Sequence, residues 1–187
     1  GRRKLLSNRR HWTENTAGLH RTQLRQLLRK ARDTEIGKEA KFEAIAQRPD
    51  EDLIKAYNAA LPVTDWYGFQ ERLVRLREQG QPDVLWPGLV KHFAQTSGTT
   101  AGDKFIPITK EMFVSNRRAA MDIFAHLGRK KDAGWGLRLS KLTSGKMLFL
   151  GGSAETTINE HGVHTGDLSG LVTPMIKWPL SAVYAPG

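Results

Sequence analysis

Apolar residues recur at helical spacing through the first part of the chain, up to residue 80. On one helix they occupy positions i, i+3, i+4 and i+7, and these residues are Leu24, Leu27, Leu28 and Ala31. Asp50 can cap a further helix, and Thr64 or Asp65 can cap a last one. Residues 1–80 therefore predict a helical lead-in, in which no chemical motif is visible.

From residue 81 the pattern changes to short apolar runs, which favour strands. Residues 84–86 and 89–94 are two such runs, and the second leads directly into a loop of small residues. Residues 105–108 after the loop are apolar and partly β-branched, which predicts another extended segment. Its Pro107 cannot donate a ladder hydrogen bond, so we expect this segment at a sheet edge or a strand end.

A long helix is predicted directly after this second extended segment. Thr109 can cap it, and its first residue is expected near Lys110. The apolar run at residues 147–150 is typical of a buried strand in a parallel or mixed sheet. The predicted fold class is α/β: a helical lead-in over residues 1–80, then a mixed β-sheet with flanking helices over residues 81–187 that is part of a larger domain.

The composition narrows the class of protein and its compartment. The chain has 187 residues, of which 39% are hydrophobic and 26% are charged, as is ordinary for a soluble globular domain. It contains no cysteine, which excludes disulfides and thiolate metal sites and fits a reducing compartment, so we expect a cytoplasmic protein. No apolar run approaches the length that spans a bilayer, and no membrane partner is expected.

The net charge of +10 raises the alternative of a basic nucleic-acid-binding module. The basic residues gather in residues 1–50 and 101–150. However, no recognised nucleic-acid motif appears, and the aromatic residues fall at core-like spacings without basic residues between them. A solvated surface explains the basic runs more simply, although the nucleic-acid alternative stays open.

The loop after the first predicted strands concentrates small, hydroxylated and flexible residues next to one lysine. Glycine allows close approach to a ligand and positive φ angles, hydroxyls and backbone N–H groups donate hydrogen bonds, and the lysine adds a mobile positive charge. These properties suit a polyphosphate. The candidate binding residues are Thr96, Ser97, Gly98, Thr99, Thr100, Gly102 and Lys104.

Two common phosphate-binding motifs are excluded by the spacing. The P-loop of nucleoside triphosphatases needs four residues between its glycines and a Ser or Thr after its lysine, but Gly98 and Gly102 are closer and Phe105 follows Lys104. The dinucleotide-binding fingerprint of three spaced glycines is also absent. A hairpin turn rich in Ser, Thr and Gly but without function remains the simpler alternative.

The loop resembles the phosphate-binding motif of the acyl-adenylate-forming superfamily, in which Ser/Thr-Ser-Gly-Thr-Ser/Thr precedes a short turn and a lysine. The continuation through residues 104–109 is similar to the auxin-responsive acyl acid amido synthetase family and its bacterial relatives. The segments at residues 83–87, 148–153 and 166–170 are similar as well, so the resemblance covers roughly residues 20–175.

The resemblance implies an AMP-forming ligase that uses ATP and Mg²⁺ to adenylate a carboxylic acid and transfers the acyl group to an amine, commonly that of an amino acid. It implies that Ser97, Thr99 and Thr100 supply hydroxyls and that Lys104 supplies charge for catalysis. Family members are roughly two to three times as long, so we expect an N-terminal piece that is inactive without the remainder of the enzyme. A noncatalytic nucleotide-binding remnant is a further alternative.

Two other groups of polar residues are candidate sites. His161 and His164 offer two imidazoles, but the Gly162 between them favours a turn between strands, and no metal site is predicted. Asp167 and Ser169 could border the acyl pocket, as the resemblance implies. A turn with side-chain-to-backbone hydrogen bonds explains them equally well.

Overall fold

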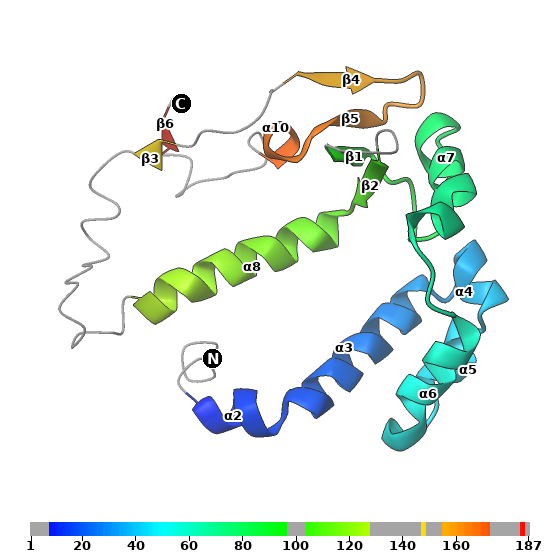
Figure 1. The fold of residues 1–187 in the computed structure, drawn as a ribbon, viewed down its shortest axis with the longest axis vertical. Helices are drawn as coiled ribbons and strands as arrows, with labels where there is room; N and C mark the ends of the chain where they lie inside the picture. Colours follow the sequence, from blue (N-terminus) through cyan, green and yellow to red (C-terminus); the bar gives the residue numbers. More distant parts are fainter. Residues whose placement is uncertain (1–7, 97–103, 128–146, 149–154, 173–183, 186–187) are drawn as a thin grey trace. The chain divides into compact units, whose positions relative to one another are not determined.

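The computed structural model of the chain contains two compact units (Figure 1). The helical unit comprises Asn8–Lys91 together with Asn159–Val163, and the sheet unit contains the other described residues. The boundary expected between residues 80 and 81 falls within the first segment of the helical unit. The structure describes residues 8–96, 104–127, 147–148, 155–172 and 184–185.

Side chains cap two of the helices in the helical unit, and the cap at Asp65 is one that the sequence predicts. Asn8 caps the first helix through a bond from the backbone N–H of His11, and Asp65 accepts bonds from two backbone N–H groups at the start of η1. The helix expected at Asp50 is present, but Asp50 is its first residue and not its cap, because Pro49 takes the N-cap position without a side-chain bond. In chain order the helices are α2 (Arg9–Glu14), α3 (Thr16–Ala31), α4 (Glu35–Glu39), α5 (Phe42–Ala46), α6 (Asp50–Ala60), the 3₁₀ helix η1 (Trp66–Phe69) and α7 (Gln70–Glu78).

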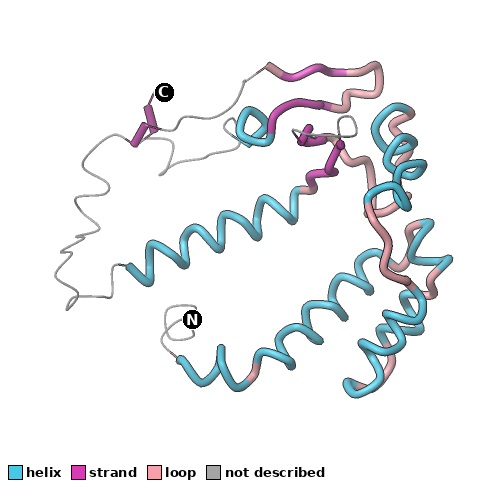
Figure 2. The backbone as a smooth tube through the Cα atoms, in the orientation of Figure 1, coloured by secondary structure: helices cyan, strands magenta, loops and turns pink. Residues whose placement is uncertain are grey.

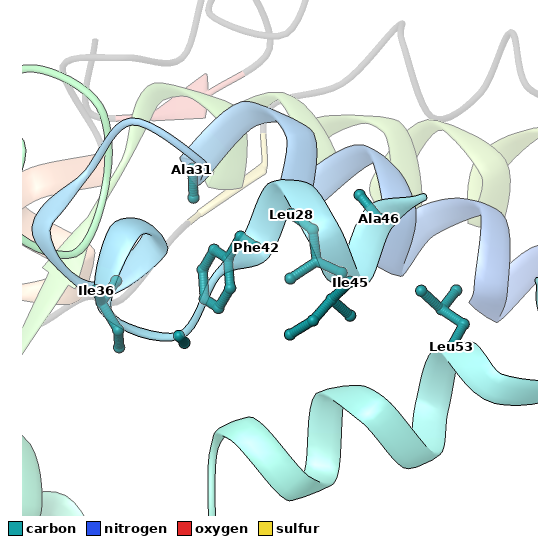
Figure 3. Close-up of a cluster of buried hydrophobic side chains, with 8 residues drawn as sticks. Leu28, Ala31, Ile36, Phe42, Ile45, Ala46 and Leu53 are labelled. Atoms are coloured by element: carbon teal, nitrogen blue, oxygen red, sulfur yellow. The ribbon is translucent and has the colours of Figure 1, made fainter. Parts of the chain in front are cut away.

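The core of the helical unit forms where α3, α5 and α6 meet (Figure 3). Leu28, Ile45 and Leu53 point toward one another there, and each is less than a tenth exposed. Leu27, which the sequence places on the same apolar face, is 42% exposed, so this part of the prediction is wrong. The buried face of α3 is narrower than the predicted apolar face, because α3 packs on its neighbours through Leu24, Leu28 and Ala31.

The connection from α3 to α4 is fixed by a buried threonine. The hydroxyl of Thr34 donates to the carbonyl of Ala31 at 2.6 Å and accepts from the N–H of Gly37 at 3.1 Å. Thr34 is 1% exposed, so these bonds are made away from solvent. A Cβ on Gly37 would lie 2.0 Å from the carbonyl oxygen of Ala31, which only glycine avoids at this position.

Arginines of α7 bind a carboxylate at the start of α4. Arg75 contacts both oxygens of Glu35, at 2.6 and 2.8 Å, and Arg72 donates to Glu35 Oε1 at 3.1 Å. Hydrogen bonds from Arg75 and then Arg72 lower the pKa of Glu35 from 4.5 to about 2. The two helices are therefore joined by a charge-assisted network between residues far apart in the sequence.

Residues 83–88 form a closed turn, and the strand expected at residues 84–86 is wrong. Asp83 has a φ of 59°, in the left-handed region, and its carboxylate accepts from the N–H of Gly88 at 2.7 Å. The N–H groups of Glu35 and Ile36 donate to the carbonyls of Asp83 and Val84. Val84 lies within this turn and is fully buried, so its apolar character reflects burial and not a place in a sheet.

The sheet unit has a four-stranded mixed sheet in the order β2-β1-β5-β4, and Figure 2 shows its strands in magenta. β1 is antiparallel to β2 and parallel to β5, and β4 is antiparallel to β5. β3 and β6 form a separate parallel pair. The element bounds are β1 (His92–Thr96), β2 (Lys104–Ile108), α8 (Lys110–Leu127), β3 (Met147–Leu148), β4 (Thr156–Ile158), β5 (His164–Asp167), α10 (Leu168–Val172) and β6 (Tyr184–Ala185).

These elements confirm the predicted α/β class and several local signals. β2, which contains Pro107, is an edge strand of the four-stranded sheet. Thr109 caps α8, because its hydroxyl accepts from the N–H of Met112 at 3.3 Å. The strand expected at residues 147–150 is present as β3, while residues 149–150 lie outside the described part of the chain. Ala94, Ile108 and Leu171 form the buried core of the sheet, against Met112 and Phe113 of α8.

Candidate functional site

Two paired strands frame the loop that the sequence identifies. β1 ends at Thr96 and β2 begins at Lys104, and these residues are partners in the antiparallel ladder. Cross-strand partners lie on the same face of a sheet, so a hydroxyl side chain and an ammonium side chain stand together at the loop end of the hairpin. The other candidates lie outside the described residues, and they are Ser97, Gly98, Thr99, Thr100 and Gly102.

The arrangement of Thr96 and Lys104 is suited to an anion. Lys104 is half-buried and Thr96 is exposed, so the lysine is partly held by the protein while the loop end stays open to solvent. A lysine ammonium is a compact point charge with three donors, and a threonine hydroxyl adds a neutral donor. The strand, loop, strand and helix order predicted from the sequence is confirmed around them.

The parallel strands β1 and β5 end at the same edge of the sheet, next to this loop. Gln95 on β1 is the partner of Asp167 on β5, one residue before β1 ends. In α/β proteins, ligands commonly bind at the carboxyl ends of parallel strands. The residues that follow β5 therefore begin beside the end of β1, where Thr96 leads into the loop, although they lie far from it in the sequence.

Asp167 and Ser169 form a hydrogen-bonded turn at the start of α10. Asp167 Oδ1 accepts from the hydroxyl of Ser169 at 2.6 Å and from its backbone N–H at 2.9 Å. These two bonds lower the pKa of Asp167, so the carboxyl group is ionised. Asp167 is also exposed to solvent. The turn explanation of these residues is confirmed, and the same turn holds a negative charge at the edge beside the loop.

Comparison with known proteins identifies the family. The model of the GH3 family N-terminal domain matches residues 5–185, which is nearly the whole chain. The chain belongs to the GH3 family. A search of curated protein sequences returned no match.

A solved structure agrees with this GH3 assignment at the level of the fold. The AtGH3.15 acyl acid amido synthetase, in complex with 2,4-DB, is similar over 87% of this chain with a TM-score of 0.57 and 16% sequence identity. The GH3 chain described here spans 27% of the length of that structure. The resemblance noted in the sequence to this synthetase family is confirmed for the N-terminal domain.

The turn that the sequence predicts around His161 and His164 is present in this GH3 domain. Residues 159–163 are a turn between β4 and β5, with Gly162 at a φ of 70°. Asn159 organises it, because its Oδ1 accepts from the N–H groups of His161 and Val163 and its Nδ2 donates to the carbonyl of Arg77. The described residues contain no group of three or more His, Cys, Asp or Glu that could hold a metal ion.

Arg25 of the basic helix α3, and Arg32 directly after its end, hold the fold of this GH3 domain. Arg25 donates to the carbonyls of Ala46 and Arg48, at 2.6 and 2.8 Å, and forms an ion pair with Asp50 at 2.5 Å. Arg32 pairs with Asp33 and Glu43. These arginines therefore have structural partners, which weakens the argument for a nucleic-acid surface on this helix.

Sequence reasoning could not pair residues of different strands at this site. The parallel register of β1 and β5 makes Gln95 the partner of Asp167, and His92 the partner of His164. The apolar run at residues 89–94 indicates β1, but it does not specify a partner strand, and β5 (His-Thr-Gly-Asp) contains no apolar run. Within the part of the chain that the structure describes, no helix has the length and apolar character needed to span a bilayer.

Proposed function

We propose that this chain is the N-terminal part of an ATP-dependent ligase that adenylates a carboxylic acid and transfers the acyl group to an amine, such as that of an amino acid. The observation that carries the proposal is the Thr-Ser-Gly-Thr-Thr loop with its lysine, set between β1 and β2 of a GH3 N-terminal domain. The acyl acid amido synthetase activity named for the similar structure supports the same class of reaction.

In the proposed first step, a carboxylate oxygen of the acid attacks the α-phosphorus of ATP. The bond between this phosphorus and the bridging oxygen breaks, and pyrophosphate leaves. In the second step the amine nitrogen attacks the acyl carbon, AMP leaves with the carboxylate oxygen, and the amine loses a proton. Both steps need stabilisation of phosphate charge, which positioned donors and cations provide.

Lys104 and the loop hydroxyls would supply that stabilisation. Lys104 offers a positive charge and Thr96 a donor at the loop end, while Ser97, Thr99 and Thr100 offer further hydroxyls. Gly98 and Gly102 allow the backbone to approach the phosphates closely. Because none of these residues is a nucleophile or a general base, their role is binding, orientation and electrostatics.

Mg²⁺ would accompany ATP and neutralise charge on its phosphates. Mg²⁺ is usually held by substrate phosphates with one or two carboxylates, and does not need a cage of protein ligands. In this proposal the phosphate oxygens supply most of the Mg²⁺ ligands, while the hydroxyl of Thr96 and the ammonium of Lys104 bind the phosphates. We also propose a cytoplasmic location, on the absence of cysteine.

The test is ATP–pyrophosphate exchange by the full-length enzyme against a panel of carboxylic acids. We expect Lys104→Ala to lower the exchange rate by about tenfold or more, because it removes charge where pyrophosphate departs. Lys110→Ala is the matched control, as Lys110 is an exposed lysine at the start of α8 and should leave the rate unchanged. Unchanged exchange in Lys104→Ala would refute the role of Lys104.

Binding measurements on the full-length protein, together with the exchange assay, separate the alternatives. A full-length protein that binds ATP saturably but exchanges no pyrophosphate with any acid is a noncatalytic remnant. A protein that binds nucleic acid with a steep loss of affinity in added salt, and does not bind ATP, supports the basic-module alternative. The isolated 187-residue chain should show no exchange, because it spans only a part of the similar synthetase.

A further inference from the structure

Two histidines from neighbouring parallel strands lie together at the end of the sheet opposite the loop. His92 begins β1 and His164 begins β5, and the two residues are partners in the parallel register. Their ring centroids are 5.1 Å apart, with an angle of 39° between the ring planes. We propose that this pair is a binding site for a divalent transition metal ion, such as Zn²⁺ or Cu²⁺.

The spacing of the rings fits chelation. With metal–nitrogen bonds of about 2.0–2.1 Å and a tetrahedral angle, two imidazoles bound to one ion place their centroids about 5 Å apart. The 5.1 Å between His92 and His164 agrees with this value. Register partners on neighbouring strands lie about 4.8 Å apart, so the pairing of β1 with β5 itself holds the two rings at a separation that chelation needs.

The surroundings hold the rings but leave access to them. The ring of Phe113 on α8 meets His92 edge to face, at 6.4 Å between centroids. Ile108 is the partner of His92 on β2, and Ile158 is the partner of His164 on β4. His92 and His164 are both half-buried, so an ion can reach the pair and keep water as its other ligands.

The chemistry of the donors selects the ion. Imidazole nitrogen suits Zn²⁺, Cu²⁺ and Ni²⁺, whereas Mg²⁺ prefers oxygen ligands. The site is therefore distinct from the Mg²⁺ proposed at the loop, and its failure would not affect the proposed ligase activity. Since no third His, Cys, Asp or Glu completes the pair among the described residues, the affinity should be moderate. A bound ion would tie β1 to β5.

The structure assigns His164 a partner different from the one that the sequence spacing indicates. His161 is three positions away in the chain, but it belongs to the turn organised by Asn159 in the helical unit. His92 is far away in the sequence but adjacent in register. Substitution of His161 is therefore the matched control for substitution of His92.

The first experiment is NMR of the imidazole resonances of the wild-type chain, titrated with Zn²⁺ up to about 1 mM at neutral pH. Among the six histidines of the chain, we expect two to respond together, and assignment should identify them as His92 and His164. Mg²⁺ at the same concentration should leave both resonances unchanged. No response to Zn²⁺, or a joint response of His161 and His164, overturns the proposal.

The second experiment compares thermal unfolding with and without Zn²⁺. At an ion concentration about tenfold above Kd, the wild-type Tm should rise by roughly 3–6 °C. His92→Gln and His164→Gln should each weaken Zn²⁺ binding by about tenfold or more, while His161→Gln should keep the wild-type shift. A wild-type shift retained in His92→Gln, or lost in His161→Gln, refutes the site. If His92→Gln does not fold, the NMR titration of the wild type still shows whether His92 and His164 bind Zn²⁺ together.

Discussion

Replacing Thr34 by valine removes one hydroxyl from the helical unit and little else. Valine has nearly the shape of threonine, so the buried space stays filled and only the hydrogen bonds change. Thr34 Oγ1 donates to the carbonyl of Ala31 and accepts from the N–H of Gly37, and both bonds are lost. The carbonyl of Ala31 keeps a partner, because the backbone N–H of Thr34 also donates to it at 3.1 Å.

The cost of the valine therefore comes mainly from the N–H of Gly37, which stays buried without an acceptor. A buried polar group left unpaired costs about 1–3 kcal/mol, and the loss of a capping side chain costs about 1 kcal/mol within that range, so we expect about 2 kcal/mol. Thr34→Ser keeps the hydroxyl and removes one methyl group, which costs about 1 kcal/mol. The order of stability should be threonine, serine, valine.

Urea unfolding of the 187-residue chain followed by circular dichroism gives the order of the midpoints, and amide hydrogen exchange gives the local cause. The Gly37 amide should lose protection in Thr34→Val and keep it in Thr34→Ser, because only serine still offers an acceptor. If Thr34→Val is as stable as Thr34→Ser and the Gly37 amide stays protected, the capping role of the hydroxyl is refuted.

Two further changes test the helical unit. The pKa of Glu35 is lowered from 4.5 to about 2, so its ionised form contributes fully to the free energy of unfolding above about pH 4.5, and this contribution is lost as the pH falls toward 2. Glu35→Gln should lower the free energy of unfolding by roughly 1 kcal/mol at pH 7, a value discounted for solvent screening because the side chain is 36% exposed. The difference in urea midpoint between Glu35→Gln and wild type should vanish in acid. A pH-independent difference would contradict this. Lys41 has a φ of 56° between α4 and α5, so Lys41→Gly should raise the free energy of unfolding by about 0.5 kcal/mol. A lower free energy of unfolding in Lys41→Gly would show that the left-handed backbone is not strained.

Local signals in the sequence predicted the elements that depend on near neighbours. Thr109 caps the helix that follows it, Pro107 places its strand at an edge, and Asp65 caps the helix beside it. Each of these signals acts over one turn or one strand, where a single residue type has a direct physical effect. The loop was found in the same way, since its glycines and hydroxyls are consecutive, although the structure describes only its flanking residues Thr96 and Lys104.

Features that depend on distant partners could not be predicted. Asp83 adopts a left-handed conformation that its residue type does not require, because backbone bonds to Glu35 and a side-chain bond to Gly88 fix the turn. The pairing of His92 with His164 follows from the parallel register of two strands. In both cases the packing of segments far apart in the chain, and not a local preference, decides the structure.

The turn that contains Asn159 has a consequence for synthesis on the ribosome. Helix α7 is complete long before Asn159 emerges, yet the carbonyl of Arg77 near its end is bonded by the Asn159 side chain. At about 5–20 residues per second, the helical segments are exposed roughly 4–15 seconds before this last piece of their unit is made. The helical unit can therefore be finished only after most of the sheet unit has been translated, so the two units cannot mature strictly one after the other.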